Sequence, residues 1–295
     1  MNRKIVYRKA NYKNSYEKEE IKRLYSEIFD IDISDKYDLW FKTNAYGEPL
    51  GILAIDEEAN KVVGHFATSM FLANINSKLI NFRMSMGFMT DVAYRGNGIA
   101  LNLYKRLKEE IILEGKAKFI IGFPNDVSVN MHLKKMEYSL YREFNFVKIP
   151  FLKCTSKFKH IELNEIKETD IGNKTCNAIV HNKEYLLWRF KGTQYIKCIS
   201  SDNKLFVYTK FRNKIDLLYW DQNVVEKDIL ELAGFLYENE KVNSVETWNS
   251  AEFLDRYPKG ERKYHMCINY LNLDSDMRNR IDKNWLFYMG DCELF

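Results

Sequence analysis

The chain has 295 residues, of which 46% are hydrophobic and 29% charged, with only 13 glycines and 4 prolines. This composition is that of a globular protein with room for two cores, and it excludes a low-complexity chain. The net charge is +4, and the basic residues are interspersed with acidic ones, so the clustered basic face of a nucleic-acid-binding domain is not expected.

The cysteines give no metal or disulfide signature. Their number is odd, their spacings are wide, and no C-x-x-C pair occurs; they are Cys154, Cys176, Cys198, Cys267 and Cys292. The first residues lack the apolar region of a signal peptide, and no apolar run approaches the ~20 residues of a membrane span. We therefore expect a cytoplasmic protein without a structural metal and without membrane contact.

Hydrophobic periodicity predicts an α+β first half. In chain order, the expected elements are a strand at 5–8, a helix at 16–29, a second helix capped by Asp35 and running through Phe41, strands at 50–56, 61–76 and 79–93, a helix at 98–114, a strand at 119–123, a helix at 128–135 and a strand at 143–151. An antiparallel meander that leads into a strand–helix–strand crossover is typical of α+β domains.

The second half repeats this order without a glycine turn. After a polar, weakly patterned stretch at 152–180, the expected elements are a helix from 185, strands at 195–200, 204–211 and 214–220, a helix at 225–238, and strands at 243–248 and 263–272. We place the boundary near 155–165 and predict one domain over 1–155 and a second α+β domain over 165–295.

The turn Arg95-Gly96-Asn97-Gly98 stands between the long strand and the helix at 98–114. The first N–H groups of a helix lack internal partners and carry partial positive charge, so an anion binds there readily. Glycine allows phosphate oxygens to approach the main chain, and Arg95 adds a charge-assisted donor. A dinucleotide fingerprint is disfavoured, because the glycines follow an antiparallel meander. The turn therefore predicts a pyrophosphate site.

Arg95-Gly96-x-Gly98-x-Ala100, after a hydrophobic strand that ends near Val92, resembles the acetyl-CoA loop of the GCN5-related N-acetyltransferase (GNAT) superfamily. The resemblance covers about residues 4–150 by element order. It implies the GNAT fold and acetyl-CoA as co-substrate, and it extends to Asn125-x-x-Ser128 after the next strand. The implied cofactor-binding residues are Met89, Thr90, Asp91, Val92, Arg95, Gly96, Asn97, Gly98, Ile99, Ala100, Asn125 and Ser128.

The sequence departs from the family where a tyrosine is expected to protonate the leaving thiolate. His132 occupies that spacing, seven residues after Asn125, and a surface position on the helix is its more ordinary interpretation. The candidate catalytic residues are Tyr138, Tyr141 and His132. A phenol stays protonated at neutral pH, which favours a tyrosine as the acid. His65 could face the acceptor cleft, although a packed, hydrogen-bonded histidine is favoured, and Asp91 is expected to cap the turn.

The resemblance implies an acetyl-CoA-dependent N-acetyltransferase that transfers an acetyl group to a primary amine by direct attack in a ternary complex. A small-molecule amine, for example an aminosugar, is the expected acceptor. The second half resembles that of two-part bacterial GNAT proteins, and it would shape the acceptor pocket or mediate a homodimer. Two alternatives stay open. One is a FemX-like aminoacyltransferase, and the other is a CoA-binding sensor without turnover.

Overall fold

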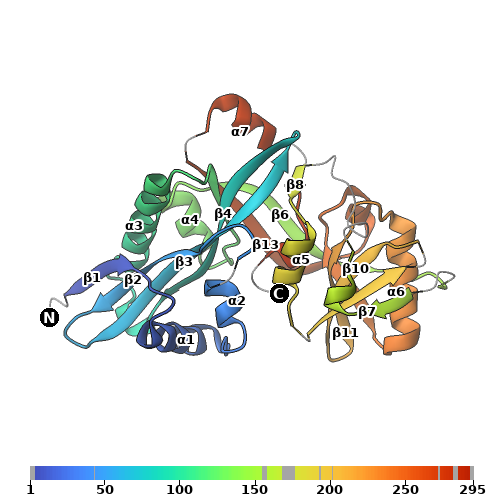
Figure 1. The fold of residues 1–295 in the computed structure, drawn as a ribbon, viewed down its shortest axis with the longest axis horizontal. Coiled ribbons are helices and arrows are strands. Elements are labelled where there is room, and N and C mark those ends of the chain that lie inside the picture. Colours follow the sequence, from blue (N-terminus) through green and yellow to red (C-terminus); the bar gives the residue numbers. More distant parts are fainter. Residues whose placement is uncertain are drawn as a thin grey trace. The chain divides into compact units, whose positions relative to one another are not determined.

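The computed structural model describes residues 4–42, 44–154, 158–167, 177–192, 194–200, 202–271, 273–281 and 285–292. The chain forms two compact units (Figure 1). The first contains Met1–Ala73, Leu79–Tyr141 and His265–Arg278, and the second contains Asn74–Lys78, Arg142–Tyr264 and Asn279–Phe295. Each unit combines strands with helices, as the sequence predicts for an α+β chain, but the paired strands among the described residues continue as one 14-stranded sheet.

A mixed sheet forms the centre of the first unit. Its strands are β1 (Ile5–Lys9), β2 (Leu50–Asp56), β3 (Lys61–Ile75), β4 (Lys78–Thr90), β5 (Phe119–Gly122) and the second half of β13 (Lys259–Tyr270), which neighbour one another in that order. Residues 259–264 of β13 belong to the second unit. The pairs β1–β2, β2–β3 and β5–β13 are antiparallel, whereas β4 and β5 are parallel. The parallel pair is the strand–helix–strand crossover expected from the sequence.

Helices cover both faces of this sheet (Figure 1). They are α1 (Ser15–Phe29), α2 (Tyr37–Phe41), α3 (Ile99–Glu114) and α4 (Val129–Lys135). Apolar residues of α3, together with Met136 and Tyr138 beyond α4, form one buried cluster with the sheet, and those of α1 and α2 form another. We call these sides the α3/α4 face and the α1/α2 face.

The second unit repeats the meander–helix–strand order. Its strands are β6 (Ser139–Ile149), β7 (Phe158–Ile161), β8 (Asn177–Ile179), β9 (Tyr195–Ser200), β10 (Leu205–Phe211), β11 (Lys214–Trp220), β12 (Ser244–Trp248) and β14 (Trp285–Leu286). Its helices are α5 (Lys183–Arg189) and α6 (Glu226–Glu240), and α7 (Ser275–Ile281) lies on a segment that contributes to both units. Strands β9–β11 are an antiparallel meander, and β11 pairs in parallel with β12 after α6.

Three details differ from the sequence-based expectation. The strand expected to reach residue 93 ends at Thr90, because the Asp91 side chain accepts a hydrogen bond from Ala93 N and starts a 3-10 turn. The stretch at 152–180 contains β7 and β8, although 155–157 and 168–176 lie outside the described residues. Residues 142–154 group with the second unit and 265–278 with the first, since β6 pairs with β12 and β13 pairs with β5.

Across the described ranges, none of the helices combines the length and apolarity that a transmembrane helix requires.

Candidate acyl-CoA site

Strands β4 and β5 separate next to the glycine turn. They pair only at Arg83–Ile120 and Met84–Ile121, and β5 ends one residue later, at Gly122. β4 continues alone on this side from Ser85 to Thr90. The backbone of its last six residues therefore borders a gap in the sheet, which we call the splay.

The turn after β4 presents unpaired backbone donors. Gly96 and Gly98 have φ angles of 82° and 74°, and Gly98 is the N-cap of α3 without a side-chain cap. In the described part of the chain, none of the N–H groups of residues 96–101 has a protein acceptor. A Cβ atom added at either glycine would meet nothing within 4 Å. Open space in front of several free N–H groups is the arrangement that an anion requires.

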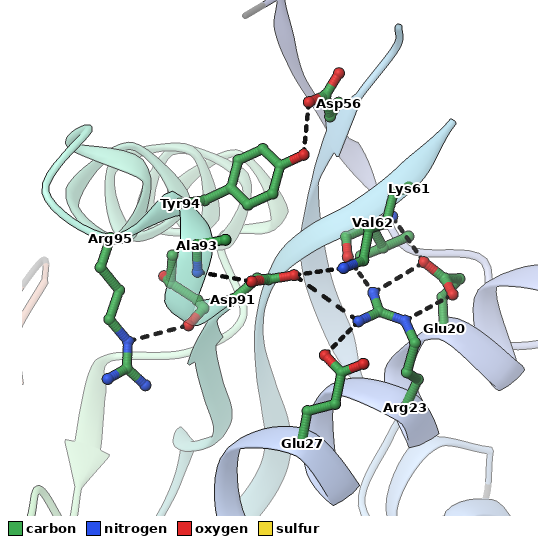
Figure 2. A network of polar contacts seen from close by, with 11 residues as sticks. Glu20, Arg23, Glu27, Asp56, Lys61, Val62, Asp91, Ala93, Tyr94 and Arg95 are labelled. Atoms are coloured by element: carbon green, nitrogen blue, oxygen red, sulfur yellow. Dashed lines mark hydrogen bonds and ion pairs between the residues drawn. The ribbon is translucent and has the colours of Figure 1, made fainter. Parts of the chain in front are cut away.

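Asp91 anchors the start of this turn (Figure 2). Its carboxylate accepts hydrogen bonds from Ala93 N at 2.9 Å and from Lys61 Nζ at 2.7 Å, and Arg23 lies 3.9 Å away. Burial alone would raise the pKa of Asp91, but the hydrogen bonds from Lys61 and Ala93 outweigh it and hold the pKa below its usual range. Asp91 is thus a capping residue, as expected, and its negative charge is balanced by Lys61 and Arg23.

Tyr94 anchors the same turn from the other side. Its buried hydroxyl donates to Asp56 Oδ2 at 2.7 Å, and Asp56 Oδ1 accepts from the N–H groups of Glu58 and Ala59 in the β2–β3 hairpin. Figure 2 shows that Asp91 and Tyr94 tie the turn to β3 and to the end of β2. The start of the glycine turn is therefore held by the protein's own side chains.

Tyr94→Phe tests this anchor. The change leaves the buried Asp56 without its phenolic donor, and hydrogen bonds to charged groups contribute about 1.5–3 kcal/mol. We expect the free energy of unfolding, measured by urea denaturation, to fall by about 2 kcal/mol. A fall below about 0.5 kcal/mol, the size expected for an ordinary surface substitution, would show that the hydroxyl does not anchor the turn.

The other expected cofactor residues divide into buried and open ones. Met89 and Ile99 are buried, and Val92 is 62% exposed. Asn97 Nδ2 donates to Tyr94 O at 3.1 Å, and exposed Arg95 reaches back to Thr90 O at 3.4 Å. The Arg95 contact is long, so the guanidinium is held only weakly.

Asn125 and Ser128 form the turn that starts α4. Asn125 Oδ1 accepts hydrogen bonds from Ser128 N at 3.0 Å and from Ser128 Oγ at 2.9 Å. Within the described residues, the Asn125 side-chain amide nitrogen has no protein acceptor, so it is the group of this turn that remains available to a ligand.

His132 is buried at the splay, contrary to the expected surface position, because α4 turns it toward β4 and β5. It is 4% exposed, and its ring packs edge-on against Phe88 of β4 and Tyr138. Its Nδ1 lies 3.0 Å from the Ser128 carbonyl oxygen, which can only accept, so Nδ1 carries the proton. Nε2 has no partner among the described residues and is left as an acceptor. Burial lowers the pKa of His132 below 6.5, against the opposing effect of the Ser128 hydrogen bond.

The two candidate tyrosines differ in burial. Tyr138 is buried, and Ser85 is the polar side chain near its hydroxyl, in a contact outside regular hydrogen-bond geometry. Burial raises the pKa of Tyr138 well above that of a free tyrosine, so it stays protonated. Tyr141, on β6, is half-buried. A Cβ added at Gly122 would come within 4 Å of both Tyr138 and His132, so these two side chains flank the end of β5.

His65 is packed and hydrogen-bonded, as favoured from the sequence. It is fully buried on the α1/α2 face, and its Nδ1 lies 3.1 Å from the Gly87 carbonyl oxygen. Gly87 was not among the expected site residues. Its signal in the sequence is an isolated glycine inside a long apolar strand, which suggests a bulge.

The second unit lacks an anion site at the corresponding place. The turn between β11 and α6 contains no glycine, and two of its N–H groups donate to carboxylates of the same turn. Asp221 accepts from Asn223 N at 2.7 Å, and Asp228 accepts from Val225 N at 2.7 Å. A phosphate there would meet negative charge instead of free donors, so this turn does not suit a pyrophosphate.

Comparisons with known proteins agree with this geometry at the level of the fold. No family model matches the sequence, and no curated protein matches it. Among solved structures, a conserved Enterococcus faecalis V583 protein described as a probable N-acyltransferase has a TM-score of 0.67 and 15% identity, over 90% of this chain and 73% of its own.

Two further structures are similar over most of their length. A GCN5-related N-acetyltransferase from Anabaena variabilis has a TM-score of 0.66 and 12% identity, over 91% of this chain and 73% of its own. Saccharomyces cerevisiae N-myristoyltransferase with bound myristoyl-CoA has a TM-score of 0.63 and 11% identity, over 95% of this chain and 83% of its own. The chain therefore has the fold of the GCN5-related N-acetyltransferases, in the two-unit arrangement expected from its sequence.

Proposed function

We propose that this chain is an acyl-CoA-dependent N-acyltransferase, with acetyl-CoA as donor and a primary amine of a small molecule as acceptor. The observation that carries the proposal is the row of unpaired N–H groups at residues 96–101, in front of two glycines with positive φ and beside the splay. These donors match a pyrophosphate, whose negative charge the start of α3 would stabilise. Arg95, which is exposed, would add a charge-assisted hydrogen bond.

The side chains at the splay suit the proton transfers of this reaction. The amine nitrogen attacks the thioester carbonyl carbon, the C–S bond breaks, and CoA leaves as the thiol. His132 Nε2 would accept the proton that the amine loses, and the Tyr138 hydroxyl would donate one to the departing sulfur. The donor amide of Asn125 would contact the pantetheine arm.

A turnover assay tests the proposal. Release of thiol from acetyl-CoA is measured with a panel of acceptors that includes aminosugars, polyamines and peptide amines, and acetyl-CoA binding is measured by calorimetry. We expect both binding and amine-dependent turnover. Tight binding without turnover on any amine would favour the non-catalytic CoA-binding module. Turnover only with long-chain acyl-CoA would overturn acetyl-CoA as donor.

Tyr138→Phe tests the proton donor. The change removes the hydroxyl and keeps the ring that packs against His132, so we expect kcat to fall about 10-fold while the KM for acetyl-CoA stays within about twofold. A thiolate leaves readily, so the loss should lie below the 10²–10⁴-fold range of general acids. Tyr141→Phe is the matched control. If Tyr141→Phe lowers kcat and Tyr138→Phe does not, Tyr141 is the donor.

A further inference from the structure

Strand β4 contains one extra residue at Gly87. In a regular strand, residues two apart face the same side. Here Met86 and Met89, three apart, both pack on the α1/α2 face, whereas Phe88 packs on the α3/α4 face. Gly87 has φ +56°, the left-handed conformation of a glycine at a β-bulge. The bulge lies within the part of β4 that borders the splay.

The bulge turns one peptide unit across the sheet. The Gly87 carbonyl oxygen accepts from His65 Nδ1 at 3.1 Å, and the His65 ring packs against Tyr12 and Phe41 on the α1/α2 face. A peptide is planar and trans, so its N–H points opposite to its C=O. The N–H of Phe88 is therefore directed toward the α3/α4 face, on which the glycine turn and His132 lie.

A second hydrogen bond fixes the direction of the first. The Tyr12 hydroxyl lies 3.2 Å from His65 Nε2, and both side chains are buried. Because a carbonyl oxygen only accepts, Nδ1 bears the proton and Nε2 accepts from Tyr12. Burial lowers the pKa of His65 to about 3, in spite of the hydrogen bond to Gly87, so the ring is neutral at every working pH. The two hydrogen bonds therefore run in one direction: Tyr12 O–H donates to His65 Nε2, and His65 Nδ1–H donates to the Gly87 carbonyl oxygen.

No residue larger than glycine fits at the bulge. A Cβ added at Gly87 would lie 2.5 Å from the Tyr25 hydroxyl and 3.1 Å from His65 Nδ1, and the positive φ would strain it. The α1/α2 face is closed tightly over this peptide. The buried hydrogen bonds and the close contacts with Tyr25 and His65 thus hold Gly87 in a backbone conformation that would strain any residue with a Cβ atom.

We propose that His65 and Tyr12 are positioning residues, which hold the Gly87–Phe88 peptide so that the Phe88 N–H donates to the thioester carbonyl oxygen at the splay. This inference rests on the proposed acyl transfer. When the amine attacks, the carbonyl π electrons move onto oxygen, and they return when the C–S bond breaks. A donor that is fixed in advance stabilises the oxygen at that moment without reorganising.

Two variants of nearly equal shape test these hydrogen bonds. In His65→Asn the amide nitrogen takes the place of Nδ1 and can still donate to Gly87, whereas His65→Leu has no donor. We expect His65→Leu to lower kcat about 10-fold, part of the 10²–10³-fold loss for removing an oxyanion donor, and His65→Asn to stay within about threefold of the parent. CoA affinity should be unchanged in both, because the pyrophosphate site is elsewhere. Tyr12→Phe removes the hydroxyl that keeps the His65 proton on Nδ1, so its kcat should lie between those of the two His65 variants.

Infrared spectra of bound [1-13C]acetyl-CoA, recorded without amine, separate this inference from the proposed function. In the parent and in His65→Asn, the carbonyl stretch should shift to lower frequency on binding, and in His65→Leu the shift should shrink. An equal shift in all three proteins would overturn the positioning role. Loss of activity in His65→Asn as severe as in His65→Leu would instead make the imidazole itself essential. If the parent does not bind acetyl-CoA, the proposed function fails first.

Discussion

Replacing Gly98 with alanine is expected to weaken acetyl-CoA binding about 100-fold. The added methyl group would enter the open space in front of the free N–H groups, where the pyrophosphate is proposed to lie. Loss of two hydrogen bonds to a charged group costs about 3 kcal/mol, and each 1.4 kcal/mol is a factor of ten in Kd. Isothermal calorimetry with acetyl-CoA and with CoA measures the effect directly.

Gly115→Ala is the matched control for this variant. Gly115 caps the other end of α3, with φ 70°, and its added Cβ would also meet no close neighbour. Both substitutions carry the same strain of a non-glycine residue in the left-handed region, about 1–3 kcal/mol of folding stability. Gly115→Ala should therefore be destabilised like Gly98→Ala but bind acetyl-CoA like the parent. Equal affinity of the two variants would place the pyrophosphate elsewhere.

His132→Ala is expected to lower kcat at least about 100-fold, the contribution typical of a general base. The Ser128 carbonyl holds the proton on Nδ1, which leaves the Nε2 lone pair free to accept a proton. Buried beside Phe88 and Tyr138, the imidazole is neutral and ready to accept a proton at physiological pH.

The pH dependence of kcat/KM tests the role of His132 independently. A base acts only when unprotonated, so kcat/KM should fall as the pH drops through the pKa of His132. Since that pKa lies below 6.5, activity should persist to lower pH than with an ordinary histidine. His132→Ala should remove this acidic limb as well as lower the rate. A parent-like profile with parent-like kcat in the variant would assign the base to another group.

The local geometry of the candidate site could be predicted from sequence where its signal is local. Arg95-Gly96-x-Gly98 and the amphipathic helix behind it stand within one short stretch, and the structure has the helix start and the positive φ angles there. The cap formed by Asp91 and the turn formed by Asn125 are local in the same way. Each of these features needs only the hydrogen bonds of a few successive residues.

The other features of the candidate site depend on contacts between residues far apart in the chain, which local sequence patterns do not predict. The bulge at Gly87 is set by His65, which lies 22 residues earlier, and by Tyr12, a further 53 residues before His65. The burial of His132 follows from how α4 packs on β4 and β5, which periodicity over seven residues does not reveal. The split between the units was expected in a polar linker, but it is decided by which strands pair.

The pairing of β13 with β5 has a consequence for synthesis on the ribosome. Gly122 pairs with Cys267, so 145 residues of chain separate the two partners. At about 5–20 residues per second, translation takes on the order of 7–30 s to supply the strand that completes the sheet of the first unit. Until then β5 has an unpaired edge, and an exposed strand edge promotes pairing with other chains. A gene fragment that ends near residue 155 would leave this edge permanently unpaired and should aggregate.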